Sequence, residues 1–446
     1  MTNDGGMIAD LLARHAEDIP TWGHLPAAMR LKQAAVARLG PDAAFEACRG
    51  HLGVPGLDRM QRLPVRAMHD AARESGSIVG ELWPGGVAFE RPSMRVLGPE
   101  RTGMGQLPGI DRSAYLARLD HVGLRGRSAL LHWQGQLLMD YEGAEFASLP
   151  DNPGYDPGVL HADGRDVWFM DASGPALRIG EAYLLSGNHS VDFGHWITEY
   201  LPRLALARLA GLPAGMPVIV DHIVPSTILG ALPLLLGADT PVIRLPHLSV
   251  ASVERLWCAS NPIYSGFYPT QWNAATWSSI GSEPSHLATL LRELARMFGP
   301  AIDEATGDDR VFLARRPSRS KKKLLNHEAI EAVASSRGFR IAYPEDLPLV
   351  EQVRLVRGAR RLVAPEGSNA LLAWFARPGA RVAMLSPTYT LPLLDVNGIL
   401  RELDVDLTVV TGPDTPTEEE FCPYWNDYTI DAADFGRFLD GWLDAP

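Results

Sequence analysis

The spacing of hydrophobic and polar positions changes along the chain, and each change indicates a different kind of structure. Over residues 1–75 the apolar positions follow helical spacing, which predicts helices at Met7 to His15, Ala27 to Leu39 and Asp42 to His51. Residues 76–185 contain short strand-like runs between glycines and prolines, which is typical of a β-rich section.

Strand and helix patterns alternate from there on. Apolar strand runs at 216–222 and 310–316 are each followed by a helical run, for example 326–338. Strands separated by helices indicate βαβ units and a parallel sheet, whose ligands bind beyond the carboxyl ends of the strands. We therefore expect an α/β fold in which two Rossmann-like domains face a cleft. The predicted division is a helical N-terminal module at 1–75, a β-rich section leading into the first Rossmann-like domain at 76–305, and the second at 306–446.

The composition and net charge of the chain narrow the range of functions to expect. The chain has 446 residues, of which 46% are hydrophobic and 21% charged, as in a soluble globular protein. A formal net charge of -12 argues against a surface that binds nucleic acid, so an anion site requires a local basic patch. The three widely spaced cysteines have no metal-ligand spacing, which predicts reduced thiols and a cytoplasmic location. No signal peptide or membrane-spanning run is expected, which leaves peripheral association with the inner face of a membrane, or oligomeric association, as possibilities.

The stretch 187–204, GNHSVDFGHWITEYLPRL, is the first candidate for chemistry. His195, Glu199 and Arg203 are spaced by four residues, so they share one face of the predicted helix. His195 at the helix start is a candidate general base, Glu199 would orient it or act itself, and Asp192 is close in sequence. The alternative is a histidine that only packs against the second domain. Pro202 predicts a kink in this helix.

A basic tract is the second candidate. In RVFLARRPSRSKKK, residues 310–323, seven of fourteen residues are Arg or Lys. Arg315 and Arg316 end a predicted parallel strand, where their planar guanidinium groups suit a diphosphate. Arg319 and Lys323 would add charge. The alternative is a solvated basic loop.

The turn APEGSNA at 364–370 is the third candidate. Gly367 allows a tight turn and close approach to a ligand, and Ser368 or Asn369 can cap the following helix, whose free amides would favour an anion. Glu366 would accept hydrogen bonds from sugar hydroxyls. The alternative is an ordinary helix cap beside a surface acid.

Other patterns are weaker. Asp404 and Asp406 form a DxD sequence, but they precede a late strand away from the predicted cleft. The chain contains no HExxH, CxxC or GxSxG motif. No metal site is therefore predicted.

The three candidates, in this order, resemble the motifs of glycosyltransferase family 61. The resemblance is carried by FGHWITEYLPRLALA (193–207), VFLARRPSRSKKKLLNHEAI (311–330) and LVAPEGSNALLAWFARPGARVAML (362–385). It implies a GT-B fold, an inverting mechanism, no requirement for a metal, and a nucleotide-sugar donor, with UDP as the expected nucleotide. The acceptor would be an oligosaccharide, a polysaccharide or a lipid-linked glycan, in surface or capsular polysaccharide synthesis.

Carried over by position, the resemblance assigns the donor to the second domain. Arg315, Arg316 and the turn Glu366–Asn369 would bind it, Asn326 and Glu328 would support the turn, and His195 with Glu199 would lie on the acceptor side. The chain departs from many members at Glu366, where they have His, and at Trp374, where they have Asn, so donor preference does not transfer. Two other functions remain open: a non-catalytic nucleotide-sugar or polysaccharide-binding module, and an enzyme of another class, such as an epimerase.

Overall fold

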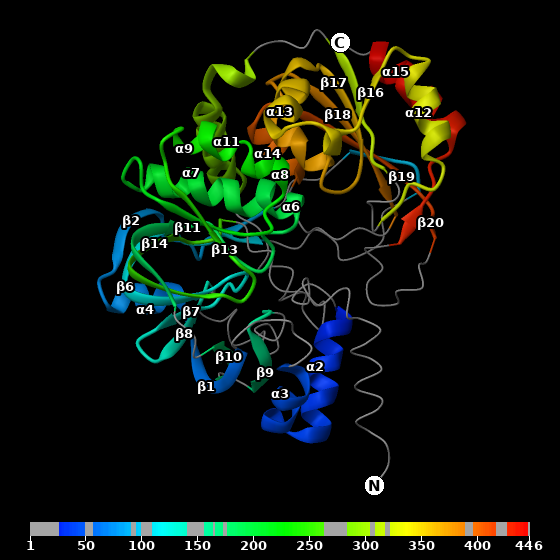
Figure 1. The fold of residues 1–446 in the computed structure, drawn as a ribbon. Helices are drawn as coiled ribbons and strands as arrows, with labels where there is room; N and C mark the ends of the chain where they lie inside the picture. Colours follow the sequence, from blue (N-terminus) through cyan, green and yellow to red (C-terminus); the bar gives the residue numbers. More distant parts are fainter. Residues whose placement is uncertain are drawn as a thin grey trace.

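The computed structural model describes residues 26–49, 57–90, 95–99, 109–140, 156–163, 166–172, 176–262, 283–303, 308–316, 322–388, 396–415 and 426–444. Within them, helices pack on two large sheets (Figure 1). The predicted α/β class is confirmed.

The larger sheet combines parallel and antiparallel strands. In the described residues its eleven strands are β13 (Val242–Leu245), β12 (Val218–Asp221), β11 (Leu177–Leu184), β14 (Val250–Ala259), β6 (Ala114–Arg125), β7 (Leu131–Trp133), β8 (Gln136–Met139), β1 (Leu57–Ala67), β10 (Asp166–Ala172) and β9 (Val159–Asp163) in spatial order, with β2 (Ile78–Trp83) paired to β6. Pairing is parallel from β13 to β14, and β14 then pairs antiparallel with β6. The β-rich section and the first set of parallel strands therefore share one continuous sheet.

The N-terminal region differs from the helical module that the sequence predicts. Helices α2 (Pro26–Leu39) and α3 (Pro41–Arg49) agree with the expectation, but residues 57–67 form β1, and α4 (Met68–Glu74) follows. Pairing of β1 with β10 over most of its length explains this difference, since tertiary pairing overrides local propensity. The buried Lys32 of α2 donates to the backbone oxygens of Asp156 and Val159, at 3.1 and 2.6 Å. This helix is thus joined to the β-rich section. The helix predicted at 7–15 lies outside the described residues.

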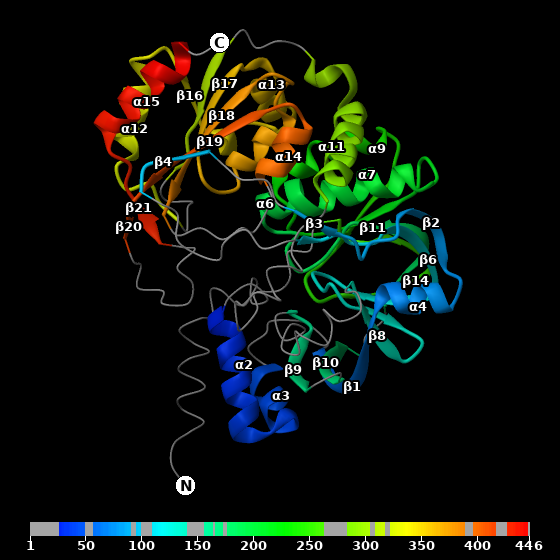
Figure 2. The same ribbon diagram turned by 180° about the vertical axis from the view of Figure 1, so that it is seen from behind.

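The second sheet is parallel throughout. Its order is β16 (Arg340–Ala342), β15 (Arg310–Leu313), β17 (Arg361–Pro365), β18 (Arg381–Pro387), β19 (Asp406–Gly412) and β4 (Arg95–Leu97). The helices of this half are α12 (His327–Ser335), α13 (Leu349–Gly358), the 3₁₀-helix η7 (Ala370–Phe375), α14 (Val396–Glu402) and α15 (Ala432–Asp444). The last strand, β4, comes from the β-rich section and lies beside β19 (Figure 2). The division at residue 305 therefore does not separate the two sheets completely.

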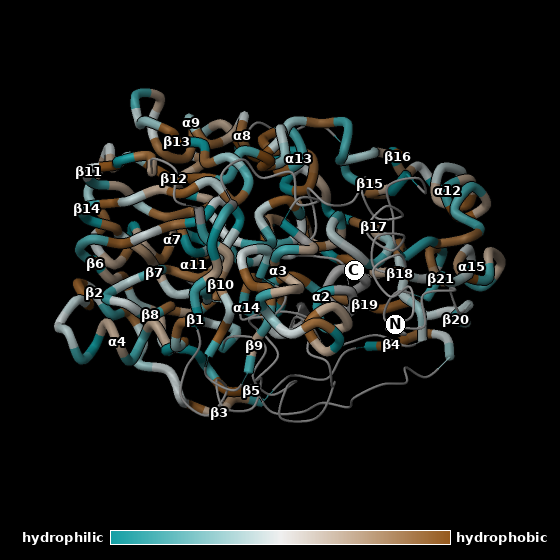
Figure 3. The backbone as a smooth tube through the Cα atoms, turned by 60° about the horizontal axis from the view of Figure 1, so that its bottom comes forward, coloured by the Kyte–Doolittle hydropathy of each residue, from teal (hydrophilic) through white to brown (hydrophobic). Residues whose placement is uncertain are grey.

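The remaining elements are short or connect the two sheets. They are α6 (Phe193–His195), the π-helix η3 (Trp196–Tyr200), α7 (Leu201–Leu209), α8 (Ser226–Leu229), α9 (Leu232–Leu236), α11 (Pro284–Phe298), η4 (Gly299–Ile302), η6 (Pro344–Asp346) and the strands β3 (Ala88–Phe89), β5 (Gly109–Ile110), β20 (Asp414–Thr415) and β21 (Asp427–Tyr428). Polar and apolar stretches alternate along the chain in both halves (Figure 3). No helix in the described part of the chain has both the length and the apolar character needed to cross a bilayer.

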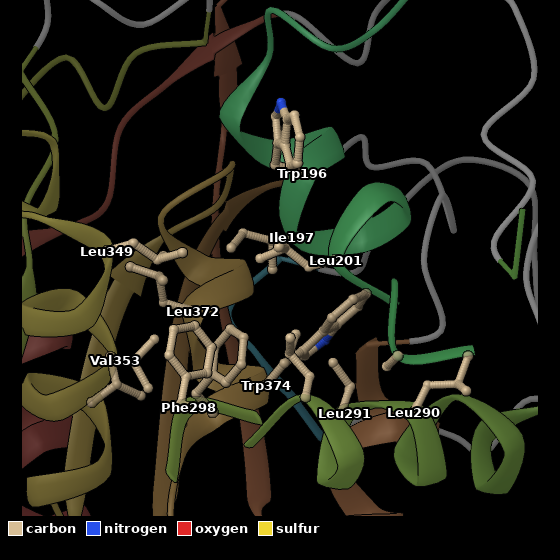
Figure 4. Packing of buried hydrophobic residues seen from close by; sticks show 14 of the residues in the cluster. Trp196, Ile197, Leu201, Leu290, Leu291, Phe298, Leu349, Val353, Leu372 and Trp374 are labelled. Atoms are coloured by element: carbon tan, nitrogen blue, oxygen red, sulfur yellow. The ribbon is translucent and has the colours of Figure 1, made fainter. Parts of the chain in front are cut away.

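One of the buried hydrophobic clusters joins the halves. Ile197 and Leu201 of the first half lie beside Leu349 and Leu372 of the second (Figure 4), and all belong to one buried cluster. Helix α11 contributes a long apolar face to the same cluster. The two sheets are therefore held together by packed side chains, which fixes the elements that carry the candidate site.

Candidate active site

The loop 187–190 is anchored by a buried carboxylate at the carboxyl end of β12. Asp221 accepts hydrogen bonds from the backbone N–H groups of Gly187, at 3.0 Å, and Arg127, at 2.5 Å, and from Ser190 Oγ at 2.5 Å. Burial raises the pKa of Asp221, and these hydrogen bonds oppose the rise. Trp196 Nε1 donates to the Ser190 carbonyl at 2.7 Å. The loop before the helix is therefore firmly placed.

The helix that follows contains a π turn. The N–H of Leu201 bonds to the carbonyl of Trp196, five residues back, and residues 196–200 form the π-helix η3. Pro202, which predicts a kink, stands directly after this turn and cannot donate a backbone hydrogen bond. Single π turns inside α-helices are frequent at functional sites.

His195 and Glu199 are in contact, as their spacing predicts. His195 Nδ1 is hydrogen-bonded to Glu199 Oε1, and Asn261 Nδ2 donates to Glu199 Oε2 at 2.8 Å. The side chain of His195 is 22% exposed, whereas that of Glu199 is 5% exposed. With an ionised Glu199 as acceptor, Nδ1 carries the proton and Nε2 presents a lone pair. This arrangement suits a general base.

Arg203 does not continue this contact. Its guanidinium lies over the ring of Tyr200, 5.7 Å from the centroid, and its carbonyl accepts from Tyr183 Oη at 3.0 Å. The predicted stripe of three residues is therefore a hydrogen-bonded pair, His195 and Glu199, followed by a residue that packs against tyrosines.

The sequence analysis did not identify His189. Its ring stacks on His195, with centroids 4.1 Å apart and planes at 6°. His189, Asp192 and His195 each place a potential ligand atom within 4.8 Å of the others. The stack does not suit a cation, because imidazole lone pairs lie in the ring plane, and an ion in the plane of one ring lies out of the plane of the other. The sequence signal for His189 was its place in the polar run before the helix.

The strand end and the turn of the second half meet. Gly367 has φ +139°, and a Cβ there would overlap the guanidinium of Arg315. The turn also touches the first half, because a Cβ on Gly194 would lie 2.8 Å from Ser368 Oγ. Gly194 is the neighbour of His195. These two glycines thus allow Arg315, the turn 366–369 and the helix that carries His195 to approach each other closely.

Glu366 has protein partners. Lys322 Nζ lies 3.2 Å from Glu366 Oε1, and Ser386 Oγ donates to Glu366 Oε2. Both members of the ion pair are largely buried, with 5% and 11% of their side chains exposed. Burial, together with the negative charge of Glu366, raises the pKa of nearby Tyr428. The carboxylate predicted to bind sugar hydroxyls is therefore also the counter-ion of Lys322, which was not among the predicted site residues.

Arg316 has different surroundings from Arg315. It is paired with Asp346, its guanidinium lies 4.4 Å from the centroid of Tyr343, and it is exposed. Asn369, expected to cap the helix, instead donates to the Ala314 carbonyl at 2.9 Å and to Glu345 at 3.2 Å. Its amide therefore ties the turn to the end of β15.

The other residues predicted to bind the donor do not all lie at the pocket. Lys323 is exposed and lines a pocket with Arg315. Asn326 is bonded through its side chain to the backbone of Ile430, so it holds the C-terminal segment and not the turn. Glu328 is exposed in the first turn of α12. Arg319 lies outside the described residues.

The pocket lies at the carboxyl ends of β15 and β17. Its lining combines basic and apolar side chains with one acid: Phe312, Arg315, Lys322, Lys323, Leu324, His327, Glu331 and Pro365. Glu331 accepts from Tyr343 Oη at 2.8 Å. His327 and Glu331 share a face of α12, a spacing visible in the sequence but not singled out there. The Asp404–Asp406 sequence lies at the opposite, amino end of β19, away from this pocket.

This arrangement can be compared with known proteins. Residues 193–383 match the family model described as Glycosyltransferase 61. The predicted resemblance to glycosyltransferase family 61 is thereby confirmed, and the matched region includes His195, Glu199, Arg315 and the turn 366–369. The match indicates a glycosyltransferase, an enzyme that takes a sugar donor and an acceptor glycan. A comparison with curated proteins found no match.

Proposed function

We propose that this protein is an inverting, metal-independent glycosyltransferase that moves a sugar from a nucleoside-diphosphate sugar, with UDP as the nucleotide, to a hydroxyl of a glycan acceptor. In this proposal the two halves act as a GT-B pair, with the donor on the second, and the product enters surface or capsular polysaccharide synthesis at the cytoplasmic side of a membrane. The observation that carries it is the contact of Gly194 with Ser368, which places the His195–Glu199 pair beside the turn that holds Arg315.

His195 would act as the base. Its Nδ1–H donates to Glu199, and its Nε2 takes the proton of the acceptor hydroxyl as that oxygen attacks the anomeric carbon. The bond between that carbon and the diphosphate breaks on the opposite face, which inverts the configuration. Glu199 stabilises the imidazolium that results.

Arg315 would stabilise the leaving diphosphate. Charge builds on the diphosphate as its bond breaks, and preorganised cations near it lower the barrier. This role is supported by the pocket that Arg315 lines together with Lys323 and His327, while Lys322 is paired with Glu366. The stacked geometry of His189 and His195 is the support for metal independence.

Replacement of His195 by alanine tests the proposal. Transfer should be lost, because no base remains, whereas UDP should still raise the melting temperature of the variant to the wild-type extent. The wild-type assay should be unaffected by a chelator. Full transfer by H195A would refute the mechanism, and nucleotide-sugar binding without any transfer by the wild-type protein would favour the binding-module function.

A further inference from the structure

Asn261 contacts the candidate base pair from a different part of the chain. It follows β14, whose carboxyl end lies beside that of β11 in the larger sheet. Its Nδ2 donates to Glu199 Oε2 at 2.8 Å, while Glu199 Oε1 is bonded to His195. Both carboxylate oxygens of Glu199 are therefore engaged, one by the imidazole and one by the amide.

Asn261 is itself held in place. Its backbone N–H donates to Asp140 Oδ2, at the end of β8. The buried Arg112 donates to the Asp140 carbonyl at 3.2 Å and lies 3.8 Å from Asp140 Oδ1. Because Asp140 fixes the backbone of Asn261, the amide of Asn261 has a defined position relative to Glu199.

We propose that Asn261 is a positioning residue for the base, an inference that rests on the proposed function. An ionised Glu199 only accepts hydrogen bonds, so the amide turns its NH₂ group toward it. This bond stabilises the ionised carboxylate and fixes its second oxygen. Glu199 then holds the proton on Nδ1 of His195 and keeps Nε2 available for the acceptor.

Other charged groups surround this pair. Tyr200 lies on the same helix, and Arg203 covers its ring. His189 stacks on His195, with Asp192 close by. The hydrogen bond from Asn261 goes to Glu199, so we expect a shift in the pH profile of an Asn261 variant to report on the Glu199 contact.

Two substitutions separate positioning from packing. N261A removes the donor, and N261D keeps the shape but places a carboxylate against Glu199. If the amide positions the base, N261A should lower kcat roughly 10- to 100-fold, the factor that corresponds to one hydrogen bond to a charged group, with the donor KM unchanged. N261D should be less active than N261A. The acid limb of the pH profile should move to higher pH in N261A, since Glu199⁻ is less stabilised.

The matched control is Q61A. Gln61 also donates an amide hydrogen bond to a carboxylate, Asp171, in β1 and outside the candidate site. The Q61A variant should keep the wild-type kcat and pH profile.

Wild-type kinetics in N261A, or higher activity in N261D than in N261A, would overturn the inference. If N261A melts far below the wild type, the kcat of N261D is compared with that of the wild type instead, because this isosteric change preserves packing. A kcat equal to that of the wild type would then overturn the inference. Full activity of H195A would instead refute the proposed function.

Discussion

At the scale of single residues, neighbours in sequence have different environments. Arg315 lies against Gly367 and lines the pocket, whereas Arg316 is exposed and paired with Asp346 beside Tyr343. Both residues follow the same strand, β15, which ends at Leu313, two residues before Arg315, and the sequence treats them alike. Of the two, only Arg315 lines the pocket in which we propose that the diphosphate binds.

This difference predicts unequal effects on nucleotide binding. R315A should weaken UDP binding by roughly 1.5–3 kcal/mol, as expected for the loss of a hydrogen bond to a charged group. R316A should leave the affinity nearly unchanged, since an exposed ion pair contributes little. Calorimetric titration of the two variants measures both effects. Equal losses, or a larger loss in R316A, would contradict the assignment.

The sequence predicted one contact among these residues and missed most of their surroundings. Spacing of four residues was enough to bring His195 to Glu199, and the end of a parallel strand was enough to place Arg315 at the pocket. The stack of His189 on His195 depends on the conformation of the loop after β11, and the bond from Asn261 depends on where the chain leaves β14; no local pattern encodes either. The burial of Lys322 likewise depends on its ion pair with Glu366, which lies in the turn after β17 and is distant in sequence.

At the scale of elements, the loop 187–190 depends on β12. Asp221 at the end of this strand accepts three hydrogen bonds that place the loop and Arg127. The sequence analysis predicted the strand but not this role, because an aspartate at a strand end is common and its partners are distant in sequence.

Removal of this carboxylate should affect folding and transfer together. D221A leaves three buried donors without their acceptor, so unfolding free energy should fall by roughly 3 kcal/mol or more, with a loss of activity. Urea denaturation measures the change. D239A, which alters an exposed aspartate after α9, should stay within about 0.5 kcal/mol of wild type. A similar stability for D221A and D239A would argue against the anchoring role.

The free energy of unfolding should depend on the protonation of Asp156, a buried carboxyl group near Lys32 of α2. Burial raises the pKa of Asp156 to about 6, although hydrogen bonds from Gly158, Ala129 and Ser128 and the charge of Lys32 oppose the rise. Because this pKa exceeds that of the unfolded chain, the folded state binds the proton more tightly. This contribution to stability is full below about pH 4 and is lost as the pH rises to about 6.

D156N should remove this part of the pH dependence. Urea midpoints measured from pH 4 to pH 7 should show a smaller decline in the variant than in wild type. The exposed D239N serves as the control and should retain the wild-type slope. An unchanged slope in D156N would show that Asp156 is not the titrating group.

At the scale of the whole molecule, the halves share their core. One apolar cluster includes residues from both sheets, and β4 crosses from the first half to the second. Calorimetry should therefore show one cooperative unfolding transition, and UDP should shift the whole of it. Two resolved transitions, only one of them moved by UDP, would show that the halves unfold independently.

The origin of β4 also constrains how the protein can be made. Its partner β19 lies more than three hundred residues later, and Thr411 of β19 bonds to the carbonyls of Leu97 and Pro99. On the ribosome, residues 95–97 emerge early and wait until nearly the entire chain has been translated before they can pair. A fragment that begins at residue 306 would leave the edge of β19 uncovered and prone to association with other strands, so the second half is best expressed and engineered within the full chain.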